Sequence, residues 1–422
     1  MNSKAPRGTK DLFGKNILYW HKIEDVIRKV CRTYAVREIR TPIFEHTELF
    51  VKSTGESSDV VKKEMYTFED KGGRSLTLKP EGTPGTVRAF IENGMMDEAK
   101  PTKLYYVSPF FRYEKPQAGR YRQFHQFGVE LFGSYSPLLD AEAIAIAHRV
   151  ITELGIKNTV LYINSLGCVD CRKQYNDTLK NFIAKNIGNL CGMCHERFEL
   201  NPLRVLDCKN ENCQSFLKNS PSVLDCLAEE CCKKDFDFLQ EVLNKMDIPF
   251  VVDHRIVRGL DYYTQTVFEF VCADDLGAQS TLCGGGRYDT LIKNNGGKDT
   301  GAVGFGMGIE RLLLVIENQN LLQDVDYGVD IYIGGMGENG IFEAIAKVQE
   351  LRKMGYIAES DTVGRSVKAQ LKYADKIGAK FSAIIGDNEI QTKKLSIKNM
   401  ETGGKLEVGI TEIEQFLQDS SM

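Results

Sequence analysis

The sequence predicts an α/β (α+β) protein with a mainly antiparallel sheet flanked by helices, a small helical cysteine-rich insertion and a C-terminal α/β unit. The chain has 422 residues, more than one ordinary hydrophobic core accommodates. Nine of its 12 cysteines fall between Cys168 and Cys232, which marks that segment as a separate piece. From residue 329 onward, strand-like and helix-like segments alternate. We therefore expect one unit over residues 1–325, with the insertion at about 168–245, and a second unit over 326–422.

The first segment mixes helix and strand signals. Apolar residues at helical spacing predict a helix over 16–36, and the helix expected over 83–93 has Pro84 in its first turn. Alternating apolar and polar residues predict a hairpin of strands 66–68 and 75–78, turned at Gly72-Gly73. Two longer strand-like stretches, 105–112 and 123–132, flank a polar loop. Strands joined in this way favour an antiparallel sheet.

The pattern changes to short polar helices over 168–244 and then returns to strands at 250–257, 266–272 and 280–283. A glycine-rich stretch and an apolar helix over 308–317 follow, before a linker at 323–328. The last unit has predicted strands at 329–333, 381–385 and 394–398, with helices at 341–354 and 413–418. Alternation of this kind predicts a partly parallel sheet.

Composition limits the function classes. Hydrophobic residues make up 42% of the chain and charged residues 27%, as in a soluble globular protein. No apolar stretch is long enough to span a bilayer, and the N-terminus lacks an apolar signal core, so we expect a cytoplasmic protein without membrane contact. The net charge of −4 argues against general nucleic-acid binding but allows a local basic patch.

The segment from Arg112 to Gly133 is the first candidate for chemistry. A basic loop follows Arg112, and the returning strand places Gln126, Gly128 and Glu130 on one face, opposite the core. Arginine offers a planar, permanently charged fork to phosphate oxygens, so the hairpin is typical of a phosphate-binding wall. The alternative interpretation, favoured for such a hairpin in isolation, is an exposed loop with solvated charges.

Three further segments add to this hairpin. The pair Tyr262-Tyr263 after Arg258-Gly259 would wall a small aromatic pocket, although such a pair is more often a half-buried strand. The run 284–286 would let backbone approach a ligand, and its alternative is a flexible turn. Glycines over 304–308 precede a helix whose first turn holds Arg311, aimed at an anion, or they form an ordinary helix start.

Taken together, these segments resemble the class II aminoacyl-tRNA synthetases, and within them the histidyl-tRNA synthetase family. Segment 112–133 looks like motif 2 and 304–312 like motif 3 of that class. Segments 258–264 and 284–289 resemble signatures of the histidyl family, and 7–11 and 79–83 also match it. The resemblance runs nearly end to end. It implies a class II catalytic core over 1–325 and an anticodon-binding domain over 326–422.

The resemblance implies a ligase that activates L-histidine with ATP to histidyl-adenylate and pyrophosphate, then transfers histidine to the 3′-terminal ribose of its tRNA. In the family pattern Arg112 holds the α-phosphate, Arg311 holds the far end of the triphosphate, and Arg258 supplies charge where related synthetases use a metal ion. Besides the catalytic Arg258, the implied site residues are Arg112, Glu114, Arg120 and Arg311 for ATP; Glu81, Thr83 and Gln126 for the histidine ammonium; Gly82 for histidine; Glu130, Tyr262 and Tyr263 for its imidazole; and Arg122 for tRNA.

The resemblance also implies partners. ATP is expected with Mg²⁺, and segment 40–45 resembles the motif 1 region that builds the family's homodimer interface. In the C-terminal unit Lys368, Lys372, Lys376 and Lys380 recur every four residues, so on a helix they would form one basic face for tRNA. A solvated surface helix is the equally weighted alternative.

The cysteine segment leaves two interpretations open. Cysteines in an intracellular chain are reduced thiols or metal ligands rather than disulfides. The spacings Cys191-x-x-Cys194 and Cys208-x4-Cys213 are compatible with a structural zinc, which Cys231-Cys232 or the pair Cys168-x-x-Cys171 could complete. Buried free thiols in a helical insertion are the favoured alternative, and no metal is assigned to the catalytic site.

Two other functions compete with the ligase. A non-charging relative that serves as a regulatory subunit of histidine biosynthesis shares the core. Such a subunit is expected to lose the C-terminal domain and the arginines, whereas this chain has Arg112, Arg258 and Arg311. A nucleotide-binding protein built on the C-terminal unit is disfavoured because 334–337 is too short a match to a Gly-x-Gly-x-x-Gly turn.

Overall fold

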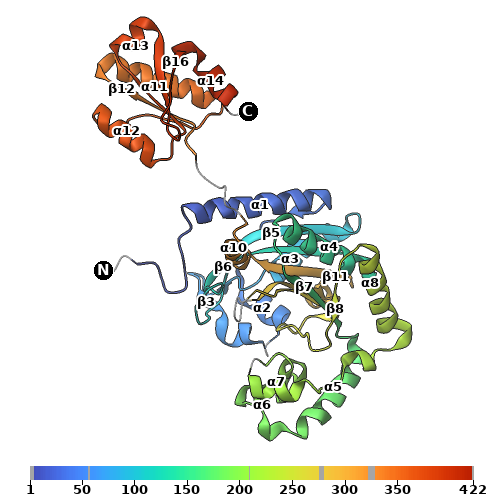
Figure 1. The fold of residues 1–422 in the computed structure, drawn as a ribbon. Coiled ribbons are helices and arrows are strands. Elements are labelled where there is room, and N and C mark those ends of the chain that lie inside the picture. Colours follow the sequence, from blue (N-terminus) through green and yellow to red (C-terminus); the bar gives the residue numbers. More distant parts are fainter. Residues whose placement is uncertain (1–3, 56–57, 209, 275–279, 322–327, 421–422) are drawn as a thin grey trace. The chain divides into compact units, whose positions relative to one another are not determined.

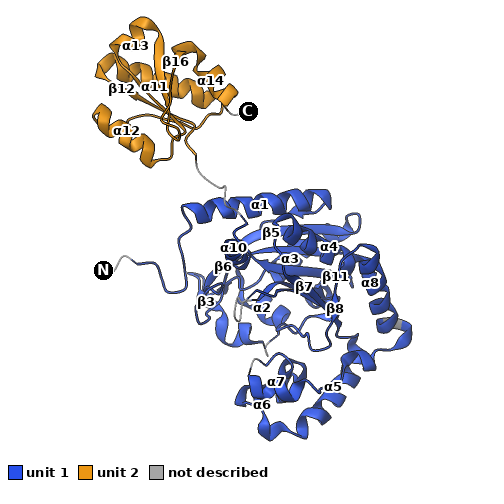
Figure 2. Cartoon of the chain, in the orientation of Figure 1, with its two compact units in different colours: residues 1–324 blue, residues 325–422 orange. Residues whose placement is uncertain are grey.

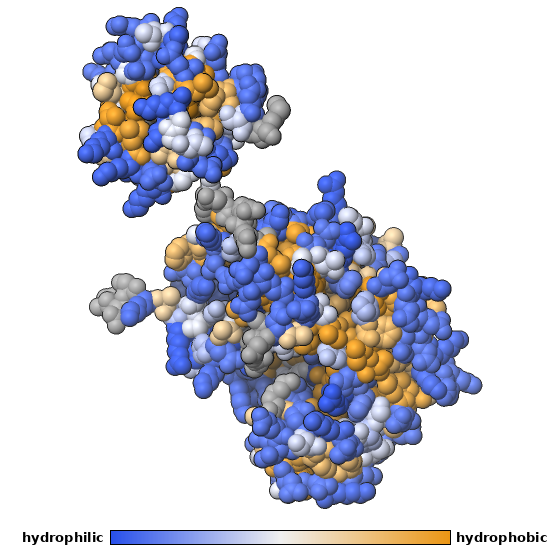
Figure 3. Space-filling model, in the orientation of Figure 1, coloured by the Kyte–Doolittle hydropathy of each residue, from blue (hydrophilic) through white to orange (hydrophobic). Residues whose placement is uncertain are grey.

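The computed structural model describes residues 4–55, 58–208, 210–274, 280–321 and 328–420 (Figure 1). The chain divides into two compact units, 1–324 and 325–422 (Figure 2). Except for Gly328, the linker predicted at 323–328 lies outside the described residues. The visible faces of both units are mainly hydrophilic, with apolar areas between the polar side chains (Figure 3).

Unit 1 is built on an eight-stranded sheet in the order β1-β5-β6-β11-β10-β9-β7-β8. Only the outer pairs β1–β5 and β7–β8 are parallel, so the prediction of a mainly antiparallel sheet is confirmed. The predicted strand pair 105–112 and 123–132 forms its centre as β5 and β6. The strands are β1 (Arg37–Glu38), β5 (Thr102–Phe111), β6 (Gln123–Phe132), β11 (Ala302–Gly308), β10 (Thr281–Arg287), β9 (Thr264–Cys272), β7 (Thr159–Ser165) and β8 (Val251–Val252).

Helices cover one face of this sheet and enclose the main core. They are α1 (Lys15–Thr33), α4 (Pro137–Glu153), α8 (Lys234–Lys245) and α10 (Ile309–Asn318). Phe127, Val129 and Leu131 of β6 point into this core, and their alternation turns Gln126, Gly128 and Glu130 to the opposite face, as predicted. The helix predicted over 16–36 ends earlier, at Thr33, because Ala35 adopts a left-handed backbone with φ of 55°.

A second layer lies on the other face. The predicted hairpin is present as β3 (Tyr66–Glu69) and β4 (Ser75–Leu78), joined by β2 (Phe44–His46) into a three-stranded sheet. The predicted helix over 83–93 is α3 (Thr83–Glu92), which begins with Pro84 in its first turn. Two helices that the pattern did not predict, α2 (Thr47–Thr54) and α9 (Leu291–Asn294), pack beside it.

The cysteine-rich insertion gathers α5 (Val169–Ala184), α6 (Gly192–Leu200) and α7 (Glu211–Leu217) at one end of unit 1 (Figure 1). Short turns separate them, among them η4 (Pro202–Val205). The helical character expected for this segment is confirmed. Within the expected span of 168–245, α8 packs against α4, and its residues Phe236, Leu239 and Leu243 belong to the main core.

One local prediction is wrong. The strand expected over 250–257 shrinks to β8, because the Asp253 carboxylate accepts a hydrogen bond from the Arg255 backbone N–H at 3.0 Å and forms a turn. The flexible turn that was the alternative interpretation of the glycine run 284–286 is also excluded, because these glycines lie inside β10 and pair on both sides with β9 and β11.

Unit 2 has a five-stranded sheet in the order β13-β12-β14-β15-β16. β12 is parallel to β13 and β14, and the remaining pairs are antiparallel, which confirms a partly parallel sheet. β13, β16 and α13 were not predicted. The elements are β12 (Ile331–Gly335), α11 (Gly337–Lys353), β13 (Ala358–Glu359), α12 (Val367–Lys376), β14 (Phe381–Ile385), α13 (Asp387–Thr392), β15 (Lys394–Asn399), β16 (Lys405–Gly409) and α14 (Ile413–Ser420).

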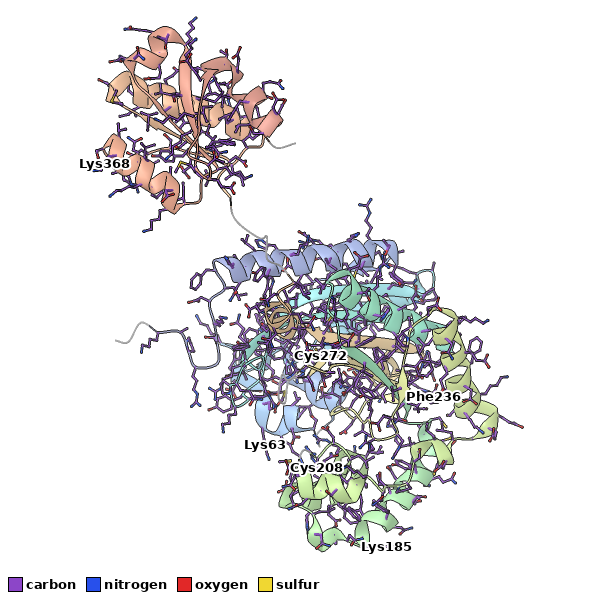
Figure 4. All side chains as sticks on the ribbon, in the orientation of Figure 1. Lys63, Lys185, Cys208, Phe236, Cys272 and Lys368 are labelled. Carbon is purple, nitrogen blue, oxygen red and sulfur yellow. The ribbon has the colours of Figure 1, made fainter. Side chains whose placement is uncertain are left out.

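Only three of the four lysines expected on the basic face lie on the same helix. Lys368, Lys372 and Lys376 lie on α12 and are exposed, and Lys368 extends from that helix in Figure 4. Lys380 does not continue the face, because α12 ends at Lys376. Its Nζ instead lies 2.9 Å from the Asp330 carboxylate.

Candidate active site

A cavity of about 380 Å³ opens on the face of the large sheet opposite the main core. Its walls come from β6, β10 and β11, from the N-terminal ends of α3 and α10, and from segment 258–263. The structure therefore brings together residues that are far apart in the sequence. The predicted site residues that line the cavity are Glu81, Gly82, Thr83, Arg112, Glu114, Arg120, Gln126, Arg258, Tyr262, Tyr263 and Arg311.

One end of the cavity is strongly positive. The Arg112 Nε donates to the Pro80 carbonyl at 2.8 Å, and the Arg311 Nη1 donates to the Thr281 carbonyl at 2.6 Å, so both side chains are held in place. Burial lowers the pKa of Arg311 to about 10, and the charges of Arg120, Arg112 and Arg258 add to this effect. Several arginines close to one another create a positive field that a polyanion relieves.

Arg258 is held in place by its contacts with β9 and β10. Its guanidinium pairs with the Glu269 carboxylate of β9. A Cβ on Gly284 would stand 2.3 Å from Arg258 Nη2, so only glycine leaves room for the guanidinium here. Burial opposes the charge on Arg258, but Glu269, Tyr263 and Asp207 together outweigh burial and raise the pKa of the arginine above its ordinary value. The side chain is therefore charged and fixed before any ligand arrives.

The loop between β5 and β6 carries the remaining predicted basic residues. Arg120 pairs with the Glu114 carboxylate at the cavity wall. Arg122 Nε donates to the Glu114 carbonyl at 3.2 Å, and its guanidinium lies 3.8 Å from the centre of the Tyr113 ring. Arg122 is not among the residues that line the cavity.

The cavity wall also holds the buried carboxyl group of Glu81, and a second buried carboxyl group, that of Glu130, lies behind it. Glu81 accepts hydrogen bonds from the Thr54 hydroxyl at 2.6 Å and the Tyr262 hydroxyl at 3.0 Å. Burial raises the pKa of Glu81. Tyr262 and Tyr263 pack ring to ring, 4.7 Å between centres, and both are almost fully buried. These paired tyrosines therefore form a pocket wall rather than a strand.

Glu130 lies behind this wall and is fully buried. It accepts hydrogen bonds from the hydroxyls of Thr83 at 2.7 Å and Tyr106 at 3.2 Å, and from that of Tyr288. Burial raises its pKa to about 8, although these hydroxyls favour the charged form. Gly304 pairs with Glu130 across β6 and β11, and a Cβ there would stand 2.1 Å from the Glu130 carboxylate.

The arrangement of arginines at one end and carboxyls at the other agrees with the comparisons to known proteins. The histidyl-tRNA synthetase family model matches residues 8–312, and the anticodon binding domain model matches residues 331–420. The chain belongs to the histidyl-tRNA synthetase family. The family match covers the catalytic unit, and the second match covers most of unit 2.

Curated relatives of this family resemble the chain over its full length. A histidine–tRNA ligase of Thermoanaerobacter pseudethanolicus is 51% identical over 419 residues, which is 99% of this chain and 100% of the relative. One from Clostridium novyi is 51% identical over 416 residues, covering 99% of both chains. The solved structure of apo Staphylococcus aureus histidyl-tRNA synthetase superposes with a TM-score of 0.83 at 37% identity, covering 98% of this chain and 99% of that one.

The chain is less similar to a structure whose title names the rival regulatory subunit. A structure titled ATP phosphoribosyltransferase regulatory subunit/histidyl-tRNA synthetase, from Bacillus halodurans, shares 21% identity with a TM-score of 0.67, covering 91% of this chain and 98% of that one. At that identity the likeness shows a shared fold only. Among the described residues, no helix combines the length and apolar character needed to cross a membrane.

The sequence analysis missed several residues that shape this synthetase site. Tyr106 and Tyr288 hold Glu130, and Glu269 holds Arg258. Arg204 and Asp207 of the insertion also line the cavity. Tyr288 stood next to the glycine run, which was a usable signal. The others are ordinary strand or loop residues whose role depends on strand register and on tertiary packing.

The insertion of this family member brings its cysteines together in two groups. The Sγ atoms of Cys191, Cys194, Cys208 and Cys213 all lie within 4.8 Å of one another, and so do those of Cys168, Cys171 and Cys232. The Cys231 side chain lies outside the described residues, and His195 is exposed and belongs to neither group.

Proposed function

We propose that the cavity performs both steps of histidine charging, with ATP phosphates at the arginine end and histidine at the carboxyl end. The chain is a histidine–tRNA ligase, an aminoacyl-tRNA synthetase that activates histidine with ATP and charges tRNA with it. The observation that carries the assignment of sites is the convergence of Arg112, Arg258 and Arg311 in one cavity that also exposes Glu81.

In the first step the histidine carboxylate attacks the α-phosphorus of ATP. A new C–O–P linkage forms, the bond from the α-phosphorus to the bridging oxygen breaks, and pyrophosphate leaves with the electron pair. Arg112 and Arg258 stabilise the charge that builds up on the α-phosphate oxygens, and Arg311 holds the far end of the triphosphate. Donors that are already fixed cost no reorganisation in the transition state. The hydrogen bonds of Arg112 and Arg311 and the ion pair of Arg258 fix these three side chains.

Histidine is recognised by charge and by hydrogen bonds. Glu81, next to Thr83 and Gln126 on the cavity wall, accepts from the ammonium group. Glu130 accepts from a ring N–H, and Tyr262 and Tyr263 enclose the imidazole. A buried polar pocket rejects isosteres that leave its groups unpaired, which gives the site its selectivity.

ATP enters aminoacyl-tRNA synthetases with Mg²⁺, and we propose the same for this chain. Mg²⁺ prefers carboxylate and phosphate oxygens and keeps several waters. Glu310 lines the cavity on the helix that carries Arg311, so a hard oxygen ligand is present beside the triphosphate region. The ion would neutralise part of the phosphate charge there.

We also propose that the active species is a cytoplasmic homodimer. The segment that resembles motif 1 exposes Ile43 and Phe44, and Phe44 contacts the ring of Phe68, which is also exposed. Apolar side chains grouped at a surface favour burial against a partner. A second copy of this chain is the partner we propose for this surface.

Pyrophosphate exchange with each of the 20 protein amino acids tests the proposed function. We expect ATP formation from labelled pyrophosphate with L-histidine alone, and aminoacylation of tRNA carrying a histidine anticodon. Equal exchange with several amino acids, or none with histidine, would contradict the assignment. Histidine binding with neither exchange nor tRNA charging would favour the regulatory relative.

The three lysines of α12 make a separate prediction about tRNA. Changing Lys368, Lys372 and Lys376 together to glutamine is expected to weaken tRNA binding by about tenfold at low salt, because each lysine that neutralises a phosphate releases counterions. Histidine-dependent pyrophosphate exchange should not change, because that step needs no tRNA. Lys353→Gln, at the end of α11, is the matched control on the same unit. Unchanged tRNA affinity would assign the three lysines to a solvated face.

A further inference from the structure

We propose that Cys191, Cys194, Cys208 and Cys213 form a four-thiolate zinc centre that fixes the insertion against the active-site cavity. Zinc bound by four thiolates has Zn–S distances of about 2.3 Å in tetrahedral geometry, which places the sulfurs about 3.8 Å apart. The Sγ atoms of Cys191 and Cys208 are 3.8 Å apart, and all four lie within 4.8 Å of one another. Figure 4 labels Cys208 among the short helices of the insertion.

The hydrogen bonds around these sulfurs suit thiolates. The backbone N–H of Cys191 donates to Cys213 Sγ at 3.3 Å, and that of Asn210 donates to Cys208 Sγ at 3.5 Å. Backbone donors aimed at sulfur stabilise the negative charge that a metal-bound cysteine carries. None of the four cysteines forms a disulfide. Ordinary packing of buried thiols does not require four sulfurs in mutual contact.

The local structure also needs a cross-link. The helices that supply these cysteines are short, nine residues in α6 and seven in α7. Isolated helices below roughly 12 residues are marginal in water. A metal bound by two pairs of cysteines, one at the start of α6 and one that brackets the start of α7, would join both helices without a larger core.

The centre would also position one wall of the cavity. The segment between the two cysteine pairs contains η4, where Arg204 Nη2 contacts the Asp59 carboxylate at 2.7 Å. Arg204, Asp59 and Asp207 all line the cavity, and Asp207 directly precedes Cys208. Asn201 Nδ2 donates to the Asp261 carboxylate at 2.9 Å, next to Tyr262. A zinc ion at Cys208 would anchor this wall at its far end.

The test is metal analysis of the full-length protein purified with reducing agent and without added metal. We expect the variant Cys208→Ser with Cys213→Ser to contain one zinc ion fewer per chain than the wild type. Cys226→Ser is the matched control, because Cys226 lies in the same insertion but in neither sulfur group. It should keep the wild-type zinc content. Equal zinc in the double variant and the wild type, or iron in place of zinc, would overturn the proposal.

A second measurement, made on the wild-type protein, tests the zinc centre even if the double variant does not fold. Cobalt(II) added to metal-depleted wild-type protein should give the visible absorption of a tetrahedral tetrathiolate site, and Cys226→Ser should give the same spectrum. Metal depletion should also make the chain more sensitive to trypsin at Arg197 and Arg204, and added zinc should restore resistance. Absence of the cobalt spectrum in the wild type, or cleavage that zinc does not change, would count against the centre.

Discussion

Arg258→Ala is expected to slow histidyl-adenylate formation by about 1,000-fold, while ATP binding weakens by less than about tenfold. Loss of one charged donor to a developing oxyanion costs about 10²–10³ in rate, and Arg258 is charged and seated before substrate arrives. Ground-state binding depends less on it, because Arg112 and Arg311 still hold the nucleotide. Single-turnover adenylate formation measures the rate, and equilibrium binding of ATP measures the affinity.

Two variants make this experiment specific. Arg255→Ala removes an arginine three residues away that pairs with Asp253 and does not line the cavity, so its rate should equal that of the wild type. Arg258→Lys should recover only part of the rate, because lysine lacks the planar fork. Losses of similar size in adenylation and in ATP binding would assign Arg258 to nucleotide binding instead.

Glu130→Gln is expected to lower kcat/KM for histidine by about 100-fold with little change in the KM for ATP. In the proposed site Glu130 accepts a hydrogen bond from the imidazole, and a hydrogen bond to a charged group contributes about 1.5–3 kcal/mol. The glutamine retains the volume, so the pocket keeps its shape. Steady-state pyrophosphate exchange at varied histidine measures the effect. A change confined to the KM for ATP would remove Glu130 from the histidine site.

Glu130→Gln is also expected to change how the free energy of unfolding depends on pH. Burial raises the Glu130 pKa to about 8, from an ordinary value of 4.5, so folding favours the protonated form. The contribution of Glu130 to stability is therefore complete below pH 4.5 and is lost as the pH rises to about 8. Glutamine does not titrate. Relative to wild type, the variant should gain about 3 kcal/mol between pH 5.5 and pH 8.5.

Denaturant unfolding of both proteins at the two pH values measures this gain. Other titrating groups are common to both chains and cancel in the difference. A difference between the variant and the wild type that does not change with pH would mean that Glu130 is already ionised in the empty site.

Much of the architecture could be predicted because it depends on local pattern. The alternation from Gln123 to Phe132 placed Phe127 and Glu130 on opposite faces of β6, and helical spacing identified α1 and α10. The resemblance supplied the residues that meet in the cavity. The structure adds their placement: Arg122 is not among the residues that line the cavity, and Glu130 lies buried behind its wall.

The partners of these residues could not be predicted because they depend on strand register. Glu269 sits opposite Gly284 across β9 and β10, and that pairing brings it to Arg258. No spacing within one strand contains this information. The glycine run 284–286 was ambiguous for a related reason. Glycine is unusual in a strand, and only the side chains that pack over it explain its presence.

Lys380 shows that sequence periodicity did not predict where α12 ends. A period of four residues predicted that it would continue the face of α12, but the backbone turns after Lys376. The helix ends because Gly378, directly after its last turn, adopts a left-handed backbone with φ of 67°. Periodicity alone therefore extends a helix too far.

The register of β6 against β11 has a consequence for how this site can change over generations. Position 304 tolerates no side chain while Glu130 stands opposite it, since a Cβ would lie 2.1 Å from the carboxylate. A shorter residue at 130 would not release that restriction, because the same Cβ would stand 2.5 Å from the Val129 carbonyl oxygen, which belongs to the backbone. Replacement of Glu130 in a descendant therefore does not make room for a side chain at 304, and the glycine is expected to outlast the acceptor.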